Sequence, residues 1–236
     1  MNEISAACAE DPKLVDKRHL TIVMDVVRLS QLALTAADGP PKQTLSRAAI
    51  GAAVLLTECT ANSCLHALPL PSKLAEDLDR LPALAKLDFY LFAATAKQID
   101  RACRETQLVA EVLKLRDQIA HPKPKRGQIA GESLEGRADY GATKELKVPY
   151  DTREWTPATA QLVSNAVFAF LKKFFLDWCQ HSKGHVTTIL VAREERMIRE
   201  KVETFVQMPA EDIRLIRAQN PEVLTFLDLR GTEIAG

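Results

Sequence analysis

The chain has 236 residues, of which 47% are hydrophobic and 26% are charged, and its 31 basic and 31 acidic side chains give no net charge at pH 7. This length allows one large domain, or a domain with an appendage, to bury a core of useful size. The balanced charge excludes a global electrostatic attraction to nucleic acid or to an anionic membrane, although a local basic patch can still bind phosphate.

Glycine and proline mark where the first helices can run, because both residues interrupt helical structure. Asp11-Pro12 can start a helix over residues 14–37, which Gly39-Pro40-Pro41 then stops. A second helix is expected over residues 43–67. It is apolar almost all round between residues 48 and 56, which is typical of a helix at the centre of a bundle.

Shorter helices are expected next. Ser72 can cap one of them, and Pro82 suits the first turn of another. Asp100 or Thr106 can restart the chain for a further helix, in which the apolar residues form one stripe. That stripe consists of Leu108, Val112, Leu115 and Ile119. Pro122 disfavours helical geometry at the residue before it, so this helix is predicted to end there.

The composition changes over residues 122–156, where four of the 9 glycines fall among charged residues. This segment is predicted to be a long loop with a short strand over residues 146–148. Thr156 followed by Pro157 has the pattern of a cap and a first-turn proline. These two residues are expected to open a helix that reaches about residue 180 and closes the bundle.

The tail is expected to be mixed in structure. Residues 186–191 are predicted to form a strand, and residues 193–206 a charged helix with a solvated face. Pro209 and Pro221 then divide the remainder into short elements.

The predicted fold is therefore all-α, an up-and-down helical bundle. The bundle is expected to span residues 1–185, with a loop insertion at 122–156, and residues 186–236 are expected to form a small C-terminal extension packed on it. No signal peptide is recognised, and no uninterrupted apolar run reaches the roughly 20 residues that span a bilayer. We therefore expect a cytoplasmic protein without a membrane partner.

The stretch LRDQIAHP, residues 115–122, carries the recognisable chemistry of the chain. Arg116-Asp117-x-x-x-His121, at the end of a late helix, resembles the signature of HEPN (higher eukaryotes and prokaryotes nucleotide-binding) domains. The stretch Glu58-x-x-x-Asn62-Ser63-Cys64-Leu65, followed by the helices near residues 81–92 and 115–123, also resembles uncharacterised bacterial HEPN-like proteins. The resemblance covers about residues 14–181, and the long loop and the tail depart from the compact members of the family.

The resemblance implies a helical bundle of HEPN type and, as in many members, a metal-independent endoribonuclease without a cofactor. It further implies a homodimer, in which Arg116 and His121 of both subunits form the site where the two motif helices meet. RNA or a nucleotide is the implied ligand. A role in stress response or phage defence, as in toxin–antitoxin systems, follows from the family, whereas a protein partner such as an antitoxin stays unknown.

The chemistry of these side chains agrees with cleavage of RNA. A His that titrates near neutrality can take a proton from a ribose 2′-hydroxyl or give one to the leaving oxygen, and an Arg can bind phosphate through its planar fork. On an ideal helix, positions five apart point about 140° from one another, so Arg116 and His121 converge only if the helix ends between them. Pro122 supplies that end, and Asp117 can orient either side chain.

A local basic strip follows the His directly and can hold the RNA backbone. It consists of Lys123, Lys125 and Arg126. The negative C-terminal end of the helix would favour the imidazolium form of His121, which suits a general acid.

Purely structural roles are an alternative for each residue. Arg116 can simply pair with Glu58 or Asp117, and His121 can cap the helix carbonyls. Glu58 interrupts an apolar helix and needs a partner if it is buried. Asn62, one turn further, can bind a ligand or make a helix-to-helix hydrogen bond. A non-catalytic interaction module and a nucleotide binder that uses Arg116 as an anion clamp are therefore open alternatives to the nuclease.

No metal site is expected. The five cysteines, at positions 8, 59, 64, 103 and 179, lack the close pairs of structural zinc sites and are predicted to be reduced, mostly buried thiols. Cys59, Cys64 and His66 would spread around a helix instead of converging. The sequence also has no phosphate-binding glycine loop, GxSxG or HExxH motif.

Overall fold

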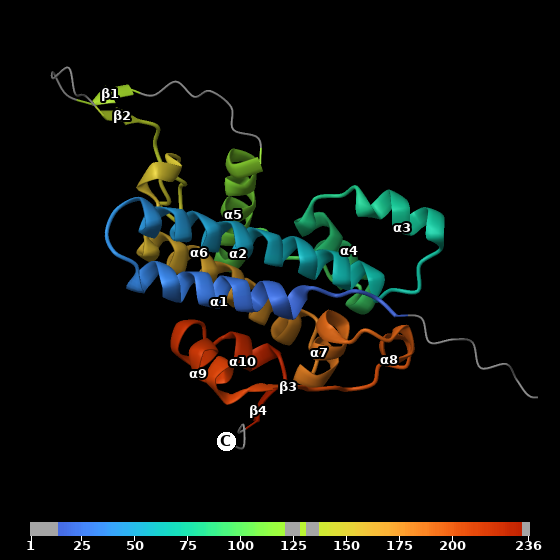
Figure 1. Cartoon of the computed structure of the whole chain (residues 1–236). Coiled ribbons are helices and arrows are strands. Elements are labelled where there is room, and N and C mark those ends of the chain that lie inside the picture. Colours follow the sequence, from blue (N-terminus) through green and yellow to red (C-terminus); the bar gives the residue numbers. More distant parts are fainter. Residues whose placement is uncertain (1–13, 121–127, 131–136, 233–236) are drawn as a thin grey trace, which may run out of the picture.

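The computed structural model describes residues 14–120, 128–130 and 137–232, with the side chains at these positions except those of residues 117–139. Helices account for most of the described residues, which confirms the all-α class. Two long helices, α1 (His19–Thr35) and α2 (Pro40–His66), lie side by side with α6 (Pro157–Lys172) behind them, while α7 (Lys183–Val191) and α9 (Ala210–Gln219) lie against the opposite side of α1 (Figure 1).

Three long helices form the centre of the molecule. They are α1 (His19–Thr35), α2 (Pro40–His66) and α6 (Pro157–Lys172). The side chains of Ile50, Ala53 and Leu56 are fully buried, which confirms the central place predicted for this part of α2. Two residues of this stretch are exposed, Ala48 at its start and Leu55, which is 55% exposed.

The prolines after Gly39 begin α2 as well as following α1. Pro40 and Pro41 occupy its first two positions, where the missing N–H groups would have no helical partner in any case. The helix therefore starts three residues earlier than predicted. The proposed start of α1 at Asp11-Pro12 lies outside the described residues.

Three further helices follow α2. They are α3 (Ser72–Asp79), α4 (Ala83–Thr95) and α5 (Arg104–Ala120). The prediction that Ser72 caps α3 is wrong, because Pro71 holds the cap position and Ser72 is already helical. Pro82 likewise stands just before α4. Helix α5 begins between the two predicted starting residues, after a turn in which the Asp100 carboxylate accepts the N–H of Ala102 at 2.8 Å.

The segment after α5 contains a small hairpin and a tight loop. Strands β1 (Gln128–Ala130) and β2 (Arg137–Asp139) are antiparallel. The strand predicted over residues 146–148 is wrong. The chain folds back there, with the Thr143 N–H donating to the Val148 carbonyl at 2.9 Å.

Glu111 of α5 holds this loop in place. Its carboxylate accepts the N–H of Glu145 at 2.9 Å and that of Leu146 at 2.9 Å. Burial alone would raise the pKa of the Glu111 carboxyl, but these hydrogen bonds outweigh it and keep the pKa below its ordinary value. Since these N–H groups bond to a side chain, no neighbouring strand is needed to satisfy them.

Helix α6 begins as predicted and ends differently. The Thr156 hydroxyl accepts the N–H of Thr159 at 3.2 Å in a reciprocal capping box, ahead of Pro157, and this confirms the predicted cap. A short 3₁₀ turn, η1 (Thr152–Glu154), precedes α6. After α6, the chain does not continue as α-helix to about residue 180, because residues Lys173–Trp178 form a π-helical turn, η2.

Two predictions for the tail are wrong. Residues 186–191 belong to α7 (Lys183–Val191), not to a strand. Ser182 caps this helix by accepting the N–H of His185 at 3.2 Å, and its core-facing side chains are buried, so packing outweighs the strand preference of its β-branched residues. Over residues 193–206 the predicted charged helix shrinks to α8 (Glu195–Arg199). The predicted boundary between residues 185 and 186 falls inside α7.

The last part of the chain is a short parallel β pair with helices between its strands. Its elements are β3 (Val206–Pro209), α9 (Ala210–Gln219), α10 (Val223–Phe226) and β4 (Leu229–Thr232). Pro209 and Pro221 separate these elements as predicted. The tail packs on the bundle through Arg28 of α1, which pairs with Asp212 of α9 at 2.8 Å, and through stacked rings of Phe175 and Phe226.

The segment before α1 is extended instead of helical, although a helix over residues 14–37 was predicted. The Val15 N–H donates to the Arg193 carbonyl at 2.7 Å, which draws this segment to the tail. The buried Lys17 ammonium donates to carbonyl groups in the last turn of α7. Burial lowers the pKa of Lys17 to about 8. Helix α1 therefore begins only at His19.

Among the described residues, one helix, α2, is long and apolar enough by length and composition to cross a membrane, since its most apolar 18-residue stretch has a mean hydropathy of 1.4. Of that stretch, 67% is buried inside the molecule. The core helix of a packed bundle meets the same criteria, so this finding is weak evidence. The charged residues Lys42, Arg47 and Glu58 interrupt the helix, which is why no continuous apolar run was expected.

Candidate functional site

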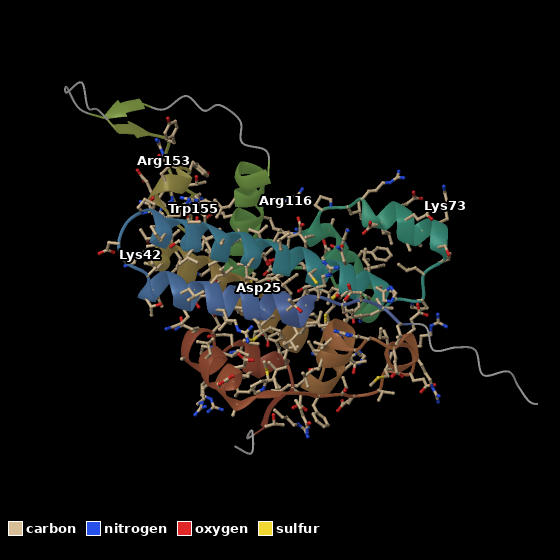
Figure 2. All side chains as sticks on the ribbon, in the orientation of Figure 1. Asp25, Lys42, Lys73, Arg116, Arg153 and Trp155 are labelled. Carbon is tan, nitrogen blue, oxygen red and sulfur yellow. The ribbon has the colours of Figure 1, made fainter. Side chains whose placement is uncertain are left out.

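The candidate site lies on the outer face of α5, whose inner face is fixed by the core. Val109, Val112 and Leu115 are fully buried, and α5 packs against α2 and α6. Arg116 follows Leu115 and therefore faces outward, with 44% of its side chain exposed. Figure 2 shows Arg116 beyond α2, on the side of the bundle away from the tail.

Glu58 of α2 is the partner that the fold brings to Arg116. The guanidinium Nη1 donates to the Glu58 carboxylate in a charged hydrogen bond. The Glu58 side chain is 29% exposed, so the pair lies at the rim of the core instead of inside it. This contact is one of the alternatives that the sequence left open, in which Arg116 pairs with Glu58 or with Asp117.

The ion pair at this exposure contributes little to the stability of the fold. Partly exposed pairs of this kind typically stabilise a protein by about 0–1 kcal/mol. Replacing either partner would therefore leave most of the fold intact, because the neighbouring core residue Leu115 keeps its own contacts. What the pair does provide is a defined position for a guanidinium and a carboxylate side by side at the surface.

Asn62, one turn further along α2, has a structural role. Its side-chain carbonyl accepts a hydrogen bond from the Lys86 ammonium of α4 at 2.7 Å, and the same ammonium pairs with Asp79 of α3 at 2.9 Å. The Lys86 side chain is only 8% exposed. Asn62 therefore joins α2 to α4 in the helix-to-helix bond that was the alternative to ligand binding.

The sequence analysis missed Lys86, although the sequence held a signal for it. The residue is charged yet stands next to Leu87, at a position of α4 that the core buries. A buried lysine needs a carboxylate and further acceptors. Asp79 and Asn62 were the polar residues within reach of that helix.

The side chains of the remaining predicted site residues lie outside the part of the chain that the structure describes. Asp117 belongs to α5, but its side chain is outside the described ones, and His121 lies outside the described residues altogether. So does the basic strip of Lys123, Lys125 and Arg126. Helix α5 is described as far as Ala120, so Arg116 stands one turn from its last described residue.

Other titratable groups gather where Tyr90, in the middle of α4, meets the partly buried His181 and His185 near the start of α7. The Tyr90 hydroxyl and the His181 Nε2 are hydrogen-bonded at 2.9 Å, and the rings of His181 and His185 are 4.6 Å apart. Burial, with the nearby His185 and Lys201, lowers the pKa of His181 to about 4. Burial raises the pKa of Tyr90. At neutral pH this cluster is therefore uncharged and serves packing.

Two clefts in the described part of the molecule lie elsewhere. One, of about 430 Å³, lies at the start of α2 and α6 and includes Lys42, Arg153 and Trp155 in its wall. These three residues lie together at one end of the bundle (Figure 2). The other, of about 330 Å³, lies between α1 and α9 and includes Asp25 and Arg193. Both clefts contain acidic and basic side chains, and neither is lined by Arg116.

The cysteines of the described residues are free thiols, as predicted. Burial raises the pKa of Cys64 well above its ordinary value and that of Cys179 to about 12, so both stay protonated and unreactive at neutral pH. Within the same residues no group of three or more His, Cys, Asp or Glu side chains is placed to hold a metal ion.

Comparisons with models of protein families, with curated proteins and with solved structures find no match to this chain. The site is therefore interpreted from its own residues.

Proposed function

We propose that the protein is a HEPN-like, RNA-binding domain that acts as a metal-independent endoribonuclease. The observation that carries the proposal is the placement of Arg116. It stands in the last turns of α5, partly exposed and oriented by the Glu58 carboxylate, directly before the sequence that supplies His121. An all-α bundle in which this helix packs against the central helix is consistent with the family's fold.

In this proposal the two motif residues divide the chemistry. Arg116 binds the scissile phosphate, because a guanidinium pairs with phosphate oxygens in a planar, charged arrangement. His121 exchanges a proton with the reacting ribose or the leaving oxygen, and Asp117 orients one of the two side chains. Attack by the 2′-hydroxyl then leaves a 2′,3′-cyclic phosphate and a free 5′-hydroxyl.

The proposal includes the partners that the resemblance implies. Lys123, Lys125 and Arg126 hold the RNA backbone next to the site. A second copy of the chain completes the site as a homodimer, with the motif helices of both subunits facing each other. The outward position of Arg116, on the side of the bundle that the tail leaves uncovered, supports such an arrangement.

One observation favours a second candidate. Arg116 already has a carboxylate partner in Glu58, which is also what a purely structural arginine would have. A non-catalytic helical interaction module is therefore the alternative function. In a third variant, a nucleotide binder, the same Arg116 would hold the phosphate without turnover.

The test is incubation of purified protein with mixed RNA in EDTA, followed by analysis of the new RNA ends. We expect the wild type to cleave and to leave cyclic phosphate ends. His121→Ala and Arg116→Ala should each lower cleavage by about 10²-fold or more, as for removal of a general acid–base group. His66→Ala and Arg217→Ala, exposed residues outside the site, serve as matched controls with unchanged activity.

A thermal melt of each variant shows whether it is folded. Absence of cleavage by the folded wild type would contradict the nuclease and leave the interaction module. Saturable binding of a nucleotide that disappears in Arg116→Ala, without turnover, would identify the binder instead.

A further inference from the structure

We propose that Glu58 is the general base of the reaction, the carboxylate that takes the proton from the attacking ribose 2′-hydroxyl. This inference rests on the proposed function and assigns within it a catalytic role that the motif itself does not supply. Cleavage of RNA needs a base for the 2′-oxygen and an acid for the 5′-oxygen. In the proposed homodimer each motif brings one arginine and one histidine, and the fold adds a carboxylate from a different helix in contact with that arginine.

The geometry begins with the contact between the two charged side chains. Nη1 of Arg116 donates to Oε1 of Glu58, and both groups reach the surface, with 44% and 29% of their side chains exposed. A phosphate bound to this guanidinium lies about 2.8 Å from its nitrogen atoms. The ribose 2′-oxygen is a close neighbour of that phosphate, so a carboxylate that touches the same guanidinium is within reach of it.

The surroundings of Glu58 leave its carboxylate accessible at the surface. On α2, the next residue toward the N-terminus on the same face is the exposed Leu55, and the next toward the C-terminus is Asn62. The charged groups that neighbouring elements bring to this stretch are Arg116 from α5 and, one turn away, Lys86 from α4.

Lys86 does not compete for the Glu58 carboxylate. Its ammonium is held by Asn62 and by Asp79 of α3, both within 2.9 Å. On the other flank, the buried Lys17 before α1 lies near Cys59, and its ammonium donates to carbonyl groups of α7. Arg116 is therefore the cation that the described residues place in contact with Glu58.

The reaction balances with these groups. As the 2′-oxygen forms its bond to phosphorus, its proton passes to Glu58, and Arg116 stabilises the negative charge that grows on the phosphate oxygens. The bond between phosphorus and the 5′-oxygen breaks. The leaving oxygen takes a proton from the general acid, the role that the proposed function gives to His121. The products are a 2′,3′-cyclic phosphate and a 5′-hydroxyl, and exchange with water restores both proton carriers.

The test compares wild type, Glu58→Gln and Glu58→Asp on a fluorogenic RNA in EDTA, with kcat and KM measured from pH 4.5 to 8. Gln keeps the shape of the side chain and an oxygen that can accept from Arg116, but it cannot take a proton. We expect its kcat to fall about 10²- to 10⁴-fold and its profile to lose the decline toward low pH. Glu58→Asp should keep that decline at a reduced kcat.

Two further variants make the assignment specific. Glu76→Gln removes one exposed carboxylate of α3 and should behave as the wild type. In Glu58→Ala, added formate should restore part of the turnover, because a free carboxylate can take the proton in the empty position. Melting curves identify the variants that are folded, and the Asp variant provides the comparison if the Gln variant is not.

The outcomes separate the two proposals. If the folded wild type does not cleave RNA, both the function and the role of Glu58 are overturned. If the wild type cleaves and Glu58→Gln keeps its kcat and its decline toward low pH, only the role of Glu58 is overturned. A rise in KM alone in that variant overturns it as well, since Glu58 would then merely position Arg116.

Discussion

His19 at the start of α1 is a fully buried histidine whose tautomer is set by one hydrogen bond. The Thr60 hydroxyl donates to the Leu56 carbonyl at 2.8 Å, so it accepts a hydrogen bond from the His19 Nε2–H at 3.1 Å. The Nδ1 atom is buried without a hydrogen-bond partner among the described residues. Burial, with the nearby Lys17, lowers the pKa of His19 to about 3, and the ring is neutral in the folded protein.

This histidine should make the protein less stable in mild acid. Its pKa is near 6.5 when the chain is unfolded and about 3 when it is folded, so the unfolded state takes up a proton first as the pH falls. The stabilisation is complete above pH 6.5 and is lost below it. Between pH 7.5 and 5.0, His19 should remove about 2 kcal/mol from the free energy of unfolding.

Urea unfolding of wild type and His19→Gln at these two pH values measures the effect. The Gln variant should lose about 2 kcal/mol less than the wild type between them. His66→Gln, at an exposed position, should change the pH dependence less. An identical pH dependence in wild type and His19→Gln would show that the ring takes up its proton without unfolding.

At the scale of single residues, sequence reasoning succeeded where one residue type disturbs a pattern. A glutamate in the apolar part of α2 needs a partner if it is buried, and Arg116 was one partner considered for it, which the structure shows in contact with it. The roles of Asn62 and Lys86 depend on how α3 and α4 pack, which sequence spacing does not reveal. The buried polar contact of His19 joins two residues 41 positions apart, on α1 and α2, and no local sequence pattern predicts it.

Among the elements, α5 and the loop that returns to it are joined by the Glu111 carboxylate. This side chain accepts two N–H groups of the loop, from Glu145 and Leu146. Glu111→Gln would turn an amide NH₂ toward donors that need an acceptor. We expect it to lower the free energy of unfolding by about 2 kcal/mol, as for hydrogen bonds to a charged group.

The measurement is urea unfolding at pH 7, together with limited proteolysis of the loop. Because the pKa of Glu111 is lowered on folding, its contribution is present above the ordinary pKa of glutamate and is lost as the pH falls below it. The deficit of the Gln variant should therefore shrink in acid. Glu145→Gln, whose carboxylate lies at the surface, is the control, and an equal loss in both variants would contradict the role of Glu111.

Element boundaries were predictable where proline or a cap sets them. Thr156 with Pro157 gave the start of α6, and Pro209 and Pro221 gave the divisions of the tail. The failures fell where long-range contacts outweigh local preference. Five of the six residues at 186–191 are β-branched, but they lie in a helix because the core buries one side of it. Residues 146–148 make their hydrogen bonds with Glu111 and within a turn.

For the whole molecule, the tail and the bundle share one core. Ile216, Val223 and Phe226 of the tail are fully buried, and Phe226 stacks on Phe175 with ring centroids 6.2 Å apart. Removing residues 193–236 would expose the side of α1 that α9 covers. We expect the shortened chain to lose cooperative unfolding or to melt at least about 10 °C lower, as a loss of several kcal/mol implies.

Circular dichroism melts of the full and shortened chains test this expectation. Asp212→Asn, which weakens only the partly exposed pair with Arg28, is a mild control that should change the free energy of unfolding by at most about 1 kcal/mol. A shortened chain that melts sharply at the temperature of the full chain would show that the bundle is a separate domain. The all-α class followed from the sequence, but this shared core did not, because it depends on contacts between the two ends of the chain.

The pairing of α1 with the tail also affects how the protein is made. Arg28 and its partner Asp212 are 184 positions apart, so α1 leaves the ribosome long before the helix that covers it. At 5–20 residues per second this interval is roughly 10–40 s. During that time an apolar face of the nascent chain lies open, and a chaperone that holds it would improve the yield more than one that acts on the finished chain.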